Sequence, residues 1–258
     1  MNTRFSHNAA QVGGEGLEVP AATDLIPTSY SAALRRRFDI DVDTIESPAA
    51  TYVPEYYESN YAYPLLIWLH DEGGTERDLL RIMPEISNRN YFGLSLRGPL
   101  EARTDQDGYR WSHLIDDVIT VENELYEQVG RLRRMYNIHS ERVFIGGCGD
   151  GATAAVRIGL RHPEWFAGVA CIDGGMPTMD KPLANYRQMQ GKRILLASEQ
   201  GDETVEQSQT RELGTLLHTA GMTICSRMYE SAKPTHHDVV RDLDRWMMQE
   251  CYRTVTVE

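Results

Sequence analysis

The chain lacks any long apolar segment. In its 258 residues, the longest run built only of aliphatic and aromatic side chains is Leu65–Leu69, whereas a membrane-spanning helix needs about 20 apolar residues. The first 30 residues contain no apolar stretch of the kind that secretory signals carry. We therefore predict a protein without a membrane span that is located in the cytoplasm.

Cysteine and basic residues are also scarce. The four cysteines, Cys148, Cys171, Cys225 and Cys251, are widely spaced and form no CxxC pair, which favours reduced, buried thiols over a disulfide framework. Lysine and arginine total 26 against 38 aspartates and glutamates, for a net charge of -12. Nucleic acids and anionic membranes select basic surfaces, so we expect neither as a partner. The arginine-rich stretch 34–37 is too short to form a nucleic-acid patch.

The first part of the chain shows little periodicity. Residues 1–30 are rich in small and polar residues and in proline, which predicts a flexible N-terminal arm. Apolar and charged residues then alternate over 37–42, which indicates an edge strand, and "TYVP" (51–54) indicates a second short strand. We expect residues 31–258 to form one domain.

Strand and helix patterns alternate through the rest of the chain. The run 63–70 is apolar almost throughout, as in a strand buried on both faces of a parallel sheet. This alternation predicts an α/β fold: a mostly parallel central sheet with helices on both faces and antiparallel edge strands near the N-terminus. The expected strands are 63–70, 91–98, 142–147, 168–173, 193–198 and 223–229, and the expected helices are 115–136, 151–162, 206–220 and 236–251.

The segment "GGCGDGATAA" (146–155) joins an expected strand to an expected helix. A G-x-S-x-G corner at such a junction presents a serine on a sharp turn. Here the frame is Gly147-Cys148-Gly149-Asp150-Gly151, so Gly149 stands at the apex. Glycine tolerates the positive φ of that position, which strains other residues by about 1–3 kcal/mol, but it offers no attacking atom.

With further segments in the same order, this corner resembles the α/β-hydrolase superfamily, and within it the phospholipase/carboxylesterase group that is related to acyl-protein thioesterases. The segment "RVFIGGCGDGA" (142–152) is similar to R-V-F-L-x-G-F-S-Q-G-G of that group. The segment "YPLLIWLHDEGG" (63–74) is similar to its strand ending in H-G-x-G, which supplies an oxyanion-hole amide, with Asp71 in place of the first glycine. "LRGPLEARTDQDGYRW" (96–111) resembles G-P…G-Y-x-W, and "ASEQGDETV" (197–205) resembles H-G-x-x-D-x-x-V. The resemblance spans about residues 50–250 and implies the α/β-hydrolase fold.

The resemblance also implies a Ser-Asp-His triad that this chain keeps only in part. Gly149 occupies the position of the serine, Asp202 that of the acid and Lys233 that of the histidine, while His236 and His237 follow a few residues later. The triad is therefore expected to be degenerate. The oxyanion site and pocket that the resemblance implies involve His70, Asp71, Asp150, Tyr109 and Trp111, and a carboxylate at position 71 would repel a developing negative charge.

Cys148 is an alternative nucleophile, because Cys-His-Asp triads occur in dienelactone hydrolase-like members of the superfamily. Its use would shift the apex of the corner by one residue and would place Asp150 where helix packing needs a small side chain. A neighbouring carboxylate would also raise the pKa of the thiol. We favour a Cys148 that packs inward as a small apolar residue.

The other candidate residues have structural interpretations. His70 ends a strand and is expected to orient the following loop, and Tyr109 and Trp111 either line a residual pocket or belong to the core. The side chains of His236 and His237 diverge if both lie on one helix, so we expect no metal site and no cofactor.

Two functions follow from these alternatives. The first, which we favour, is a non-catalytic protein of the α/β-hydrolase fold that binds a small-molecule ligand or a protein partner through its cleft. The second is an ester or thioester hydrolase that uses Cys148 with His236 or His237 and Asp202. The sequence names neither the ligand nor the partner and leaves the oligomeric state open.

Overall fold

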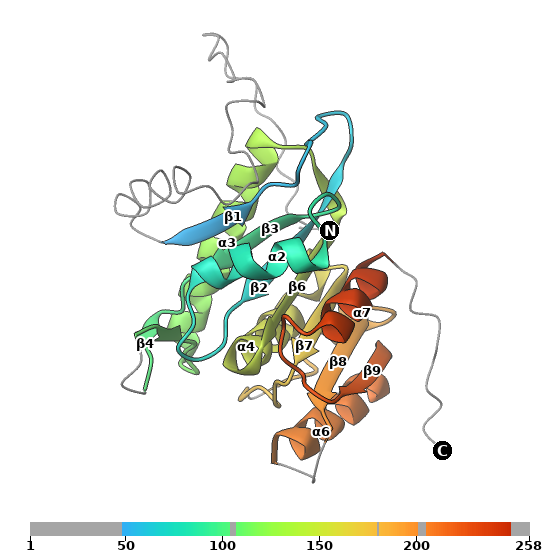
Figure 1. The fold of residues 1–258 in the computed structure, drawn as a ribbon. Coiled ribbons are helices and arrows are strands. Elements are labelled where there is room, and N and C mark those ends of the chain that lie inside the picture. Colours follow the sequence, from blue (N-terminus) through green and yellow to red (C-terminus); the bar gives the residue numbers. More distant parts are fainter. Residues whose placement is uncertain (1–47, 104–106, 180, 201–204, 249–258) are drawn as a thin grey trace.

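The computed structural model describes residues 48–103, 107–179, 181–200 and 205–248. The predicted arm (1–30), the predicted edge strand (37–42) and Asp202 lie outside these residues. Figure 1 shows the fold, whose elements in chain order are β1 (Ala49–Tyr52), β2 (Tyr63–Leu69), η2 (Glu76–Asp78), α2 (Leu79–Ile86), β3 (Phe92–Leu96), β4 (Leu100–Glu101), β5 (Tyr109–Arg110), α3 (Ile115–Met135), β6 (Ile138–Cys148), α4 (Gly149–Arg161), η3 (Pro163–Trp165), β7 (Gly168–Ile172), α5 (Tyr186–Met189), β8 (Arg193–Glu199), α6 (Val205–Thr219), β9 (Thr223–Tyr229) and α7 (His237–Met247).

The main sheet of the described residues has the strand order β1-β3-β2-β6-β7-β8-β9. β1 is antiparallel to β3 at the edge, and every other neighbouring pair is parallel. The predicted mostly parallel sheet with an antiparallel edge near the N-terminus is confirmed. β2 is buried along its whole length, because it lies inside the sheet and its apolar side chains point to two covered faces.

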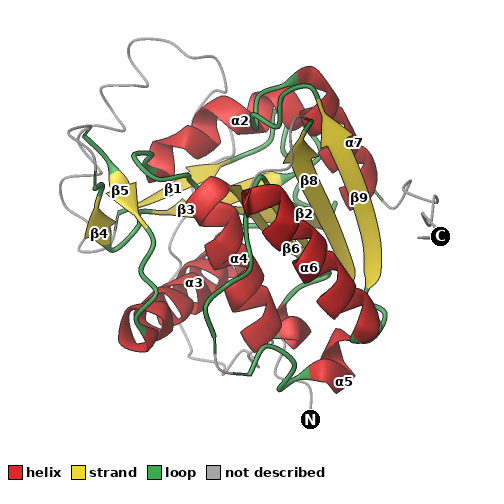
Figure 2. Cartoon of the chain, turned by 90° about the horizontal axis from the view of Figure 1, so that it is seen from below, coloured by secondary structure: helices red, strands yellow, loops and turns green. Residues whose placement is uncertain are grey.

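Helices cover both faces of this sheet, as Figure 2 shows from a second direction. α3, α4 and α6 pack on one face, in a core that also contains Leu65, Ile67 and Leu69 of β2. α2 and α7 pack on the other face, in a core that also contains Leu66 and Trp68. Alternate residues of one strand therefore supply two separate hydrophobic cores.

Several boundaries differ from the sequence prediction. α4 begins at Gly149 rather than at residue 151, β6 begins at 138 rather than at 142, and α7 covers His237–Met247 rather than 236–251. α2 is unexpected because Pro84 lies inside it, and proline normally disfavours a helix interior. The β4–β5 hairpin is also unexpected, since strands of two residues are too short to show a periodic pattern.

The thiols of the described residues are free. Cys171 and Cys225 are buried, as the wide cysteine spacing predicted, whereas Cys148 is half-buried, and Cys251 lies outside the described residues. Within the same part of the chain, none of the helices is both long enough and apolar enough to cross a membrane.

Candidate functional site

Parallel pairing brings two of the predicted site residues, Asp71 and Gly149, to one edge of the sheet. β2 ends at Leu69, which lies opposite Gly147 near the end of β6. Asp71 and Gly149, which follow these two strands, therefore meet at the carboxyl edge. Ligands of open α/β sheets bind at this edge.

Gly149 forms the corner between β6 and α4. Its φ is +55°, whereas Cys148 before it is extended, with φ -123° and ψ 144°. The left-handed region favours glycine. A Cβ built on Gly149 would overlap the carboxylate of Asp71, so oxygen atoms of another residue fill the space that a side chain at the apex would need.

Glycines on both sides of the corner let α4 approach β2 very closely. A Cβ on Gly151 would overlap the carbonyl oxygens of Leu69 and His70, and a Cβ on Gly147 would overlap the carbonyl oxygen of Leu69. These contacts agree with the interpretation that the flanking glycines allow strand and helix to pass in contact.

We expect Gly151→Ala to lower the free energy of unfolding by about 3 kcal/mol, the upper end of the usual overpacking penalty, because the backbone oxygens it meets cannot move aside. The matched control is Gly130→Ala in α3, where the nearest atom to the added Cβ is 3.6 Å away. That change should raise stability by about 0.5–1 kcal/mol. Urea denaturation measures both changes, and a Gly151→Ala variant as stable as the unmodified chain would contradict the close approach.

The carboxylate of Asp71 binds two backbone amides. Its Oδ1 accepts hydrogen bonds from the N–H of Glu72 at 2.7 Å and from the N–H of Asp150 at 2.9 Å. One amide belongs to the loop after β2 and the other to the first turn of α4, so two separate segments donate to a single oxygen. Amide pairs of this kind hold oxyanions in acyl transfer. Here the bound anion is a side chain of the protein itself.

His70 positions the loop that carries these groups. The residue is 1% exposed. Its Nε2 accepts a hydrogen bond from the N–H of Gly98 at 3.0 Å, and its Nδ1 lies 2.8 Å from the carbonyl oxygen of Asp71. Because Nε2 accepts, we assign the proton to Nδ1, which donates to that carbonyl. Burial lowers the pKa of His70, so the neutral ring holds the loop in place.

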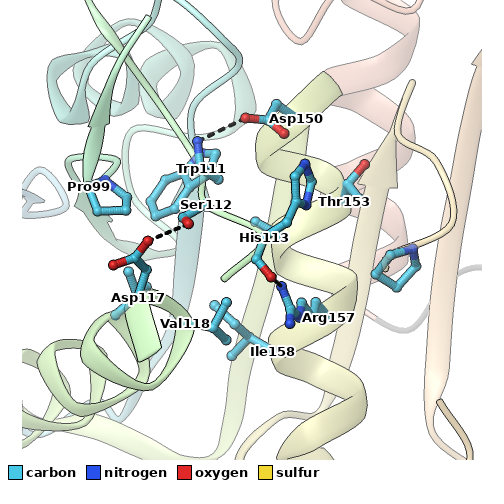
Figure 3. Close-up of a pocket in the computed structure, with 13 residues that line it drawn as sticks. Pro99, Trp111, Ser112, His113, Asp117, Val118, Asp150, Thr153, Arg157 and Ile158 are labelled. Carbon is cyan, nitrogen blue, oxygen red and sulfur yellow. Dashed lines mark hydrogen bonds between the residues drawn. The ribbon is translucent and has the colours of Figure 1, made fainter. Parts of the chain in front are cut away.

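Trp111 and Asp150 tie the segment before α3 to the same corner. The indole N–H of Trp111 donates to the carbonyl oxygen of His70, and its backbone N–H donates to Oδ2 of Asp150, both at 2.8 Å. The side chain of Asp150 therefore points toward Trp111 (Figure 3). Trp111 is only 3% exposed, so it is a core aromatic that also lines the pocket described below.

Tyr109 belongs to a polar cluster that sequence reasoning missed. Its backbone pairs with Gly73 and Gly74 at 2.9 Å. The guanidinium of Arg97 lies 4.6 Å from the centre of the Tyr109 ring. It also donates two hydrogen bonds, of 2.8 and 2.9 Å, to the buried carboxylate of Glu76. These hydrogen bonds raise the pKa of Arg97. Glu76 and Arg97 lie 21 residues apart in the sequence, so no local sequence pattern could predict that they form a pair.

Cys148 packs toward the core formed with α2 and α7. Burial raises the pKa of its thiol to about 12, and the nearby carboxylates of Asp71 and Asp173 act in the same direction. The thiolate is the nucleophilic form of cysteine, so this environment keeps Cys148 protonated and unreactive at neutral pH.

The predicted histidine candidates lie around the start of α7. Lys233 and His237 are exposed, and His236 is half-buried with an Nδ1 that lacks a hydrogen-bond partner within the described residues. No hydrogen bond joins either histidine to the thiol of Cys148 in this part of the chain. Across the same residues, histidine, cysteine and carboxylate side chains form no group of three that could hold a metal.

A small pocket, partly open to solvent and enclosing about 20 Å³, lies beside the corner between α3 and α4 (Figure 3). Within it, Arg157 donates from Nη1 to the carbonyl oxygen of His113 at 2.8 Å, and the hydroxyl of Ser112 donates to Asp117. Apolar walls with a few fixed polar groups are typical of small-molecule sites. The lining residues are Pro99, Trp111, Ser112, His113, Asp117, Val118, Val121, Asp150, Thr153, Ala154, Arg157, Ile158 and Pro177.

Arg157 and Asp173 are further polar residues near this edge that the sequence analysis did not single out. Arg157 is 7% exposed. The sequence feature that could have identified it is an arginine among the small apolar residues of an expected helix. Asp173 directly follows β7 and has a φ of +52°, which is uncommon for a residue other than glycine. The sequence feature that could have identified Asp173 is an acidic residue at the carboxyl end of an expected strand.

Comparison by sequence gives a partial match. No family profile matches the chain. The chain is 26% identical over 145 residues to NocK of Nocardia uniformis subsp. tsuyamanensis, a protein provisionally described as an esterase. The match covers 51% of this chain and 37% of that protein, so the chain spans little more than a third of this curated relative.

Comparison by structure covers more of the chain. The carboxylesterase of Bacillus cereus matches with a TM-score of 0.62 and 19% identity, over 85% of this chain and 100% of that one. A carboxylesterase from Mesorhizobium loti gives a TM-score of 0.63 at 18% identity, over 80% and 96% of the two chains. A phospholipase/carboxylesterase from Dyadobacter fermentans gives 0.59 at 16% identity, over 79% and 97%. The predicted α/β-hydrolase fold is confirmed.

Proposed function

Since the chain has the α/β-hydrolase fold, we propose that it is a non-catalytic protein of this fold that binds a small molecule in the pocket beside the β6–α4 corner, with Gly149 at the nucleophile position. One observation carries the proposal: the corner residue has no side chain, and the carboxylate of Asp71 fills the adjoining space. Acyl transfer needs an attacking atom and a free pair of amide donors. Asp71 occupies the amide pair at this corner.

The alternative hydrolase would depend on the thiolate of Cys148. With a pKa raised to about 12 by burial and by two carboxylates, that thiol supports a packing role. The esterase names of similar proteins describe those proteins, and a shared fold does not transmit a function. Loss of acyl chemistry in this chain is therefore the proposal that its own residues support.

Acyl-transfer assays test the first half of the proposal. We expect the unmodified chain to hydrolyse p-nitrophenyl acetate, p-nitrophenyl butyrate and an acyl thioester at no more than about 10³–10⁴ times the uncatalysed rate. This is the residual rate enhancement that a triad enzyme retains when its nucleophile is removed. Cys148→Ala should not change these rates. Faster turnover that disappears in Cys148→Ala would instead establish a cysteine hydrolase.

A gain-of-function variant provides the positive control for these assays. Gly149→Ser alone is not sufficient, because its Cβ would overlap the carboxylate of Asp71. The informative variant combines Asp71→Gly, Gly149→Ser and Lys233→His. If this variant gains turnover that the unmodified chain lacks, the corner is a former acyl site.

A thermal-shift screen tests the binding half. A small molecule present at 100 times its Kd should stabilise the unmodified chain by about 2.7 kcal/mol. Ala154→Phe, which places a large side chain in the pocket wall, should abolish the stabilisation. A compound that stabilises both chains equally binds elsewhere, and if every stabilising compound behaves so, the pocket is not the binding site.

A further inference from the structure

Asp71 occupies the pair of amides that would otherwise face a ligand at the carboxyl edge of the sheet. We propose that its carboxylate is an internal anion that closes the amides of Glu72 and Asp150 to acidic ligands, so that the ligand of the native cleft carries no carboxylate or phosphate at this point. The inference deepens the proposed binding function and rests on it.

The geometry of the amide pair supports this role. Both N–H groups donate to the same atom, Oδ1 of Asp71, at 2.7 and 2.9 Å, which are distances typical of hydrogen bonds to a charged acceptor. The amide of Asp150 lies in the first turn of α4, where the helix dipole adds attraction for a negative charge. A small anion from solution would have to displace a carboxylate that is already in place.

Asp71 is also held where it is. Its carbonyl oxygen accepts hydrogen bonds from Nδ1 of His70 at 2.8 Å and from the N–H of Gly74 at 2.9 Å. The loop then continues into a turn closed by Thr75, whose N–H donates to Asp78 at 3.1 Å. Because the backbone is fixed on both sides, the side chain loses little freedom on binding the amides, and this preorganisation favours it over a dissolved competitor.

A second carboxylate reinforces the exclusion of anions. Asp173 follows β7 on the other side of the corner, and it acts on the thiol of Cys148 in the same direction as Asp71. An acidic group at the corner therefore lies near a second carboxylate as well as that of Asp71, and like charges placed together are unfavourable.

Amide NMR with acetate as the probe tests the inference in three chains: unmodified, Asp71→Ala and Asp71→Asn. At constant ionic strength, we expect the Glu72 and Asp150 resonances of Asp71→Ala to shift saturably. The unmodified chain should bind acetate at least about tenfold more weakly, the scale of one hydrogen bond to a charged group. Asp71→Asn should fall between them, since its amide oxygen still accepts both bonds but carries no charge.

Each outcome of this titration either supports or overturns the role of Asp71. An acetate response in the unmodified chain as strong as in Asp71→Ala, or no response in a folded Asp71→Ala, would overturn the inference. If Asp71→Ala does not fold, the nearly isosteric Asp71→Asn replaces it, and it must bind acetate more tightly than the unmodified chain does. The amide of Asp238, in the first turn of α7, reports non-specific binding at a helix N-terminus. Acyl turnover is measured separately, so a failure here and a failure of the proposed function are distinguishable.

Discussion

Iodoacetamide will alkylate Cys148 in the folded chain about a hundredfold more slowly at pH 7 than it alkylates an unhindered cysteine. A free thiol has a pKa near 8.5, and burial raises that of Cys148 to about 12. The thiolate is then roughly 3,000-fold less abundant. The higher nucleophilicity of a more basic thiolate offsets about 25–50-fold of this, which leaves about two orders of magnitude before any steric hindrance is counted.

The pH dependence of the same reaction separates a packed thiol from a catalytic one. Because the pKa lies far above the accessible range, the rate should rise about tenfold per pH unit from pH 7 to 9.5 without a plateau. Mass spectrometry of the Cys148 peptide follows the reaction, with the guanidinium-unfolded chain as the internal reference. Rapid, stoichiometric labelling at neutral pH with a plateau below pH 8 would show an activated cysteine and would revive the hydrolase alternative.

Glu76→Ala will lower the free energy of unfolding by about 3–5 kcal/mol, which is usual when one partner of a buried ion pair is removed. The Glu76 side chain is 2% exposed, and that of Arg97, its partner, is 27% exposed. Without the carboxylate, the guanidinium stays half-buried and loses both of its hydrogen bonds to Glu76. We expect the loop that carries Asp71 to loosen as well, because Glu76 anchors that loop to the end of β3.

Two comparisons make this prediction sharp. Arg81, whose side chain is 75% exposed, forms a surface ion pair with Asp78 in the same region, and Arg81→Ala should change stability by less than about 1 kcal/mol. The paired replacement of Glu76→Leu with Arg97→Met should be less damaging than Glu76→Ala alone, since it buries no unpaired charge. Guanidinium denaturation gives all of these values, and equal losses for Glu76→Ala and Arg81→Ala would contradict a buried structural pair.

Local sequence patterns were sufficient for the presence of the parallel strands and of the long helix α3. The apolar run of β2 and the three-and-four spacing of α3 are properties of neighbouring residues, and both elements form within a residue or so of the predicted limits. Gly149 at the corner was likewise readable from its own flanking residues. α2 was not, because Pro84 argues against a helix and only packing against the sheet outweighs it.

The local sequence pattern therefore determined a parallel sheet with a glycine at a strand–helix corner. Only the tertiary structure shows that Asp71 reaches that corner. Asp71 lies 79 residues before Asp150 in the sequence, yet its carboxylate accepts a hydrogen bond from the amide of Asp150. Periodicity reports on side chains a few positions apart, whereas this contact depends on the register between β2 and β6 and on the close approach of α4. The sequence argument expected a repulsive carboxylate at position 71, and the tertiary structure shows that carboxylate bound to the amides of Glu72 and Asp150.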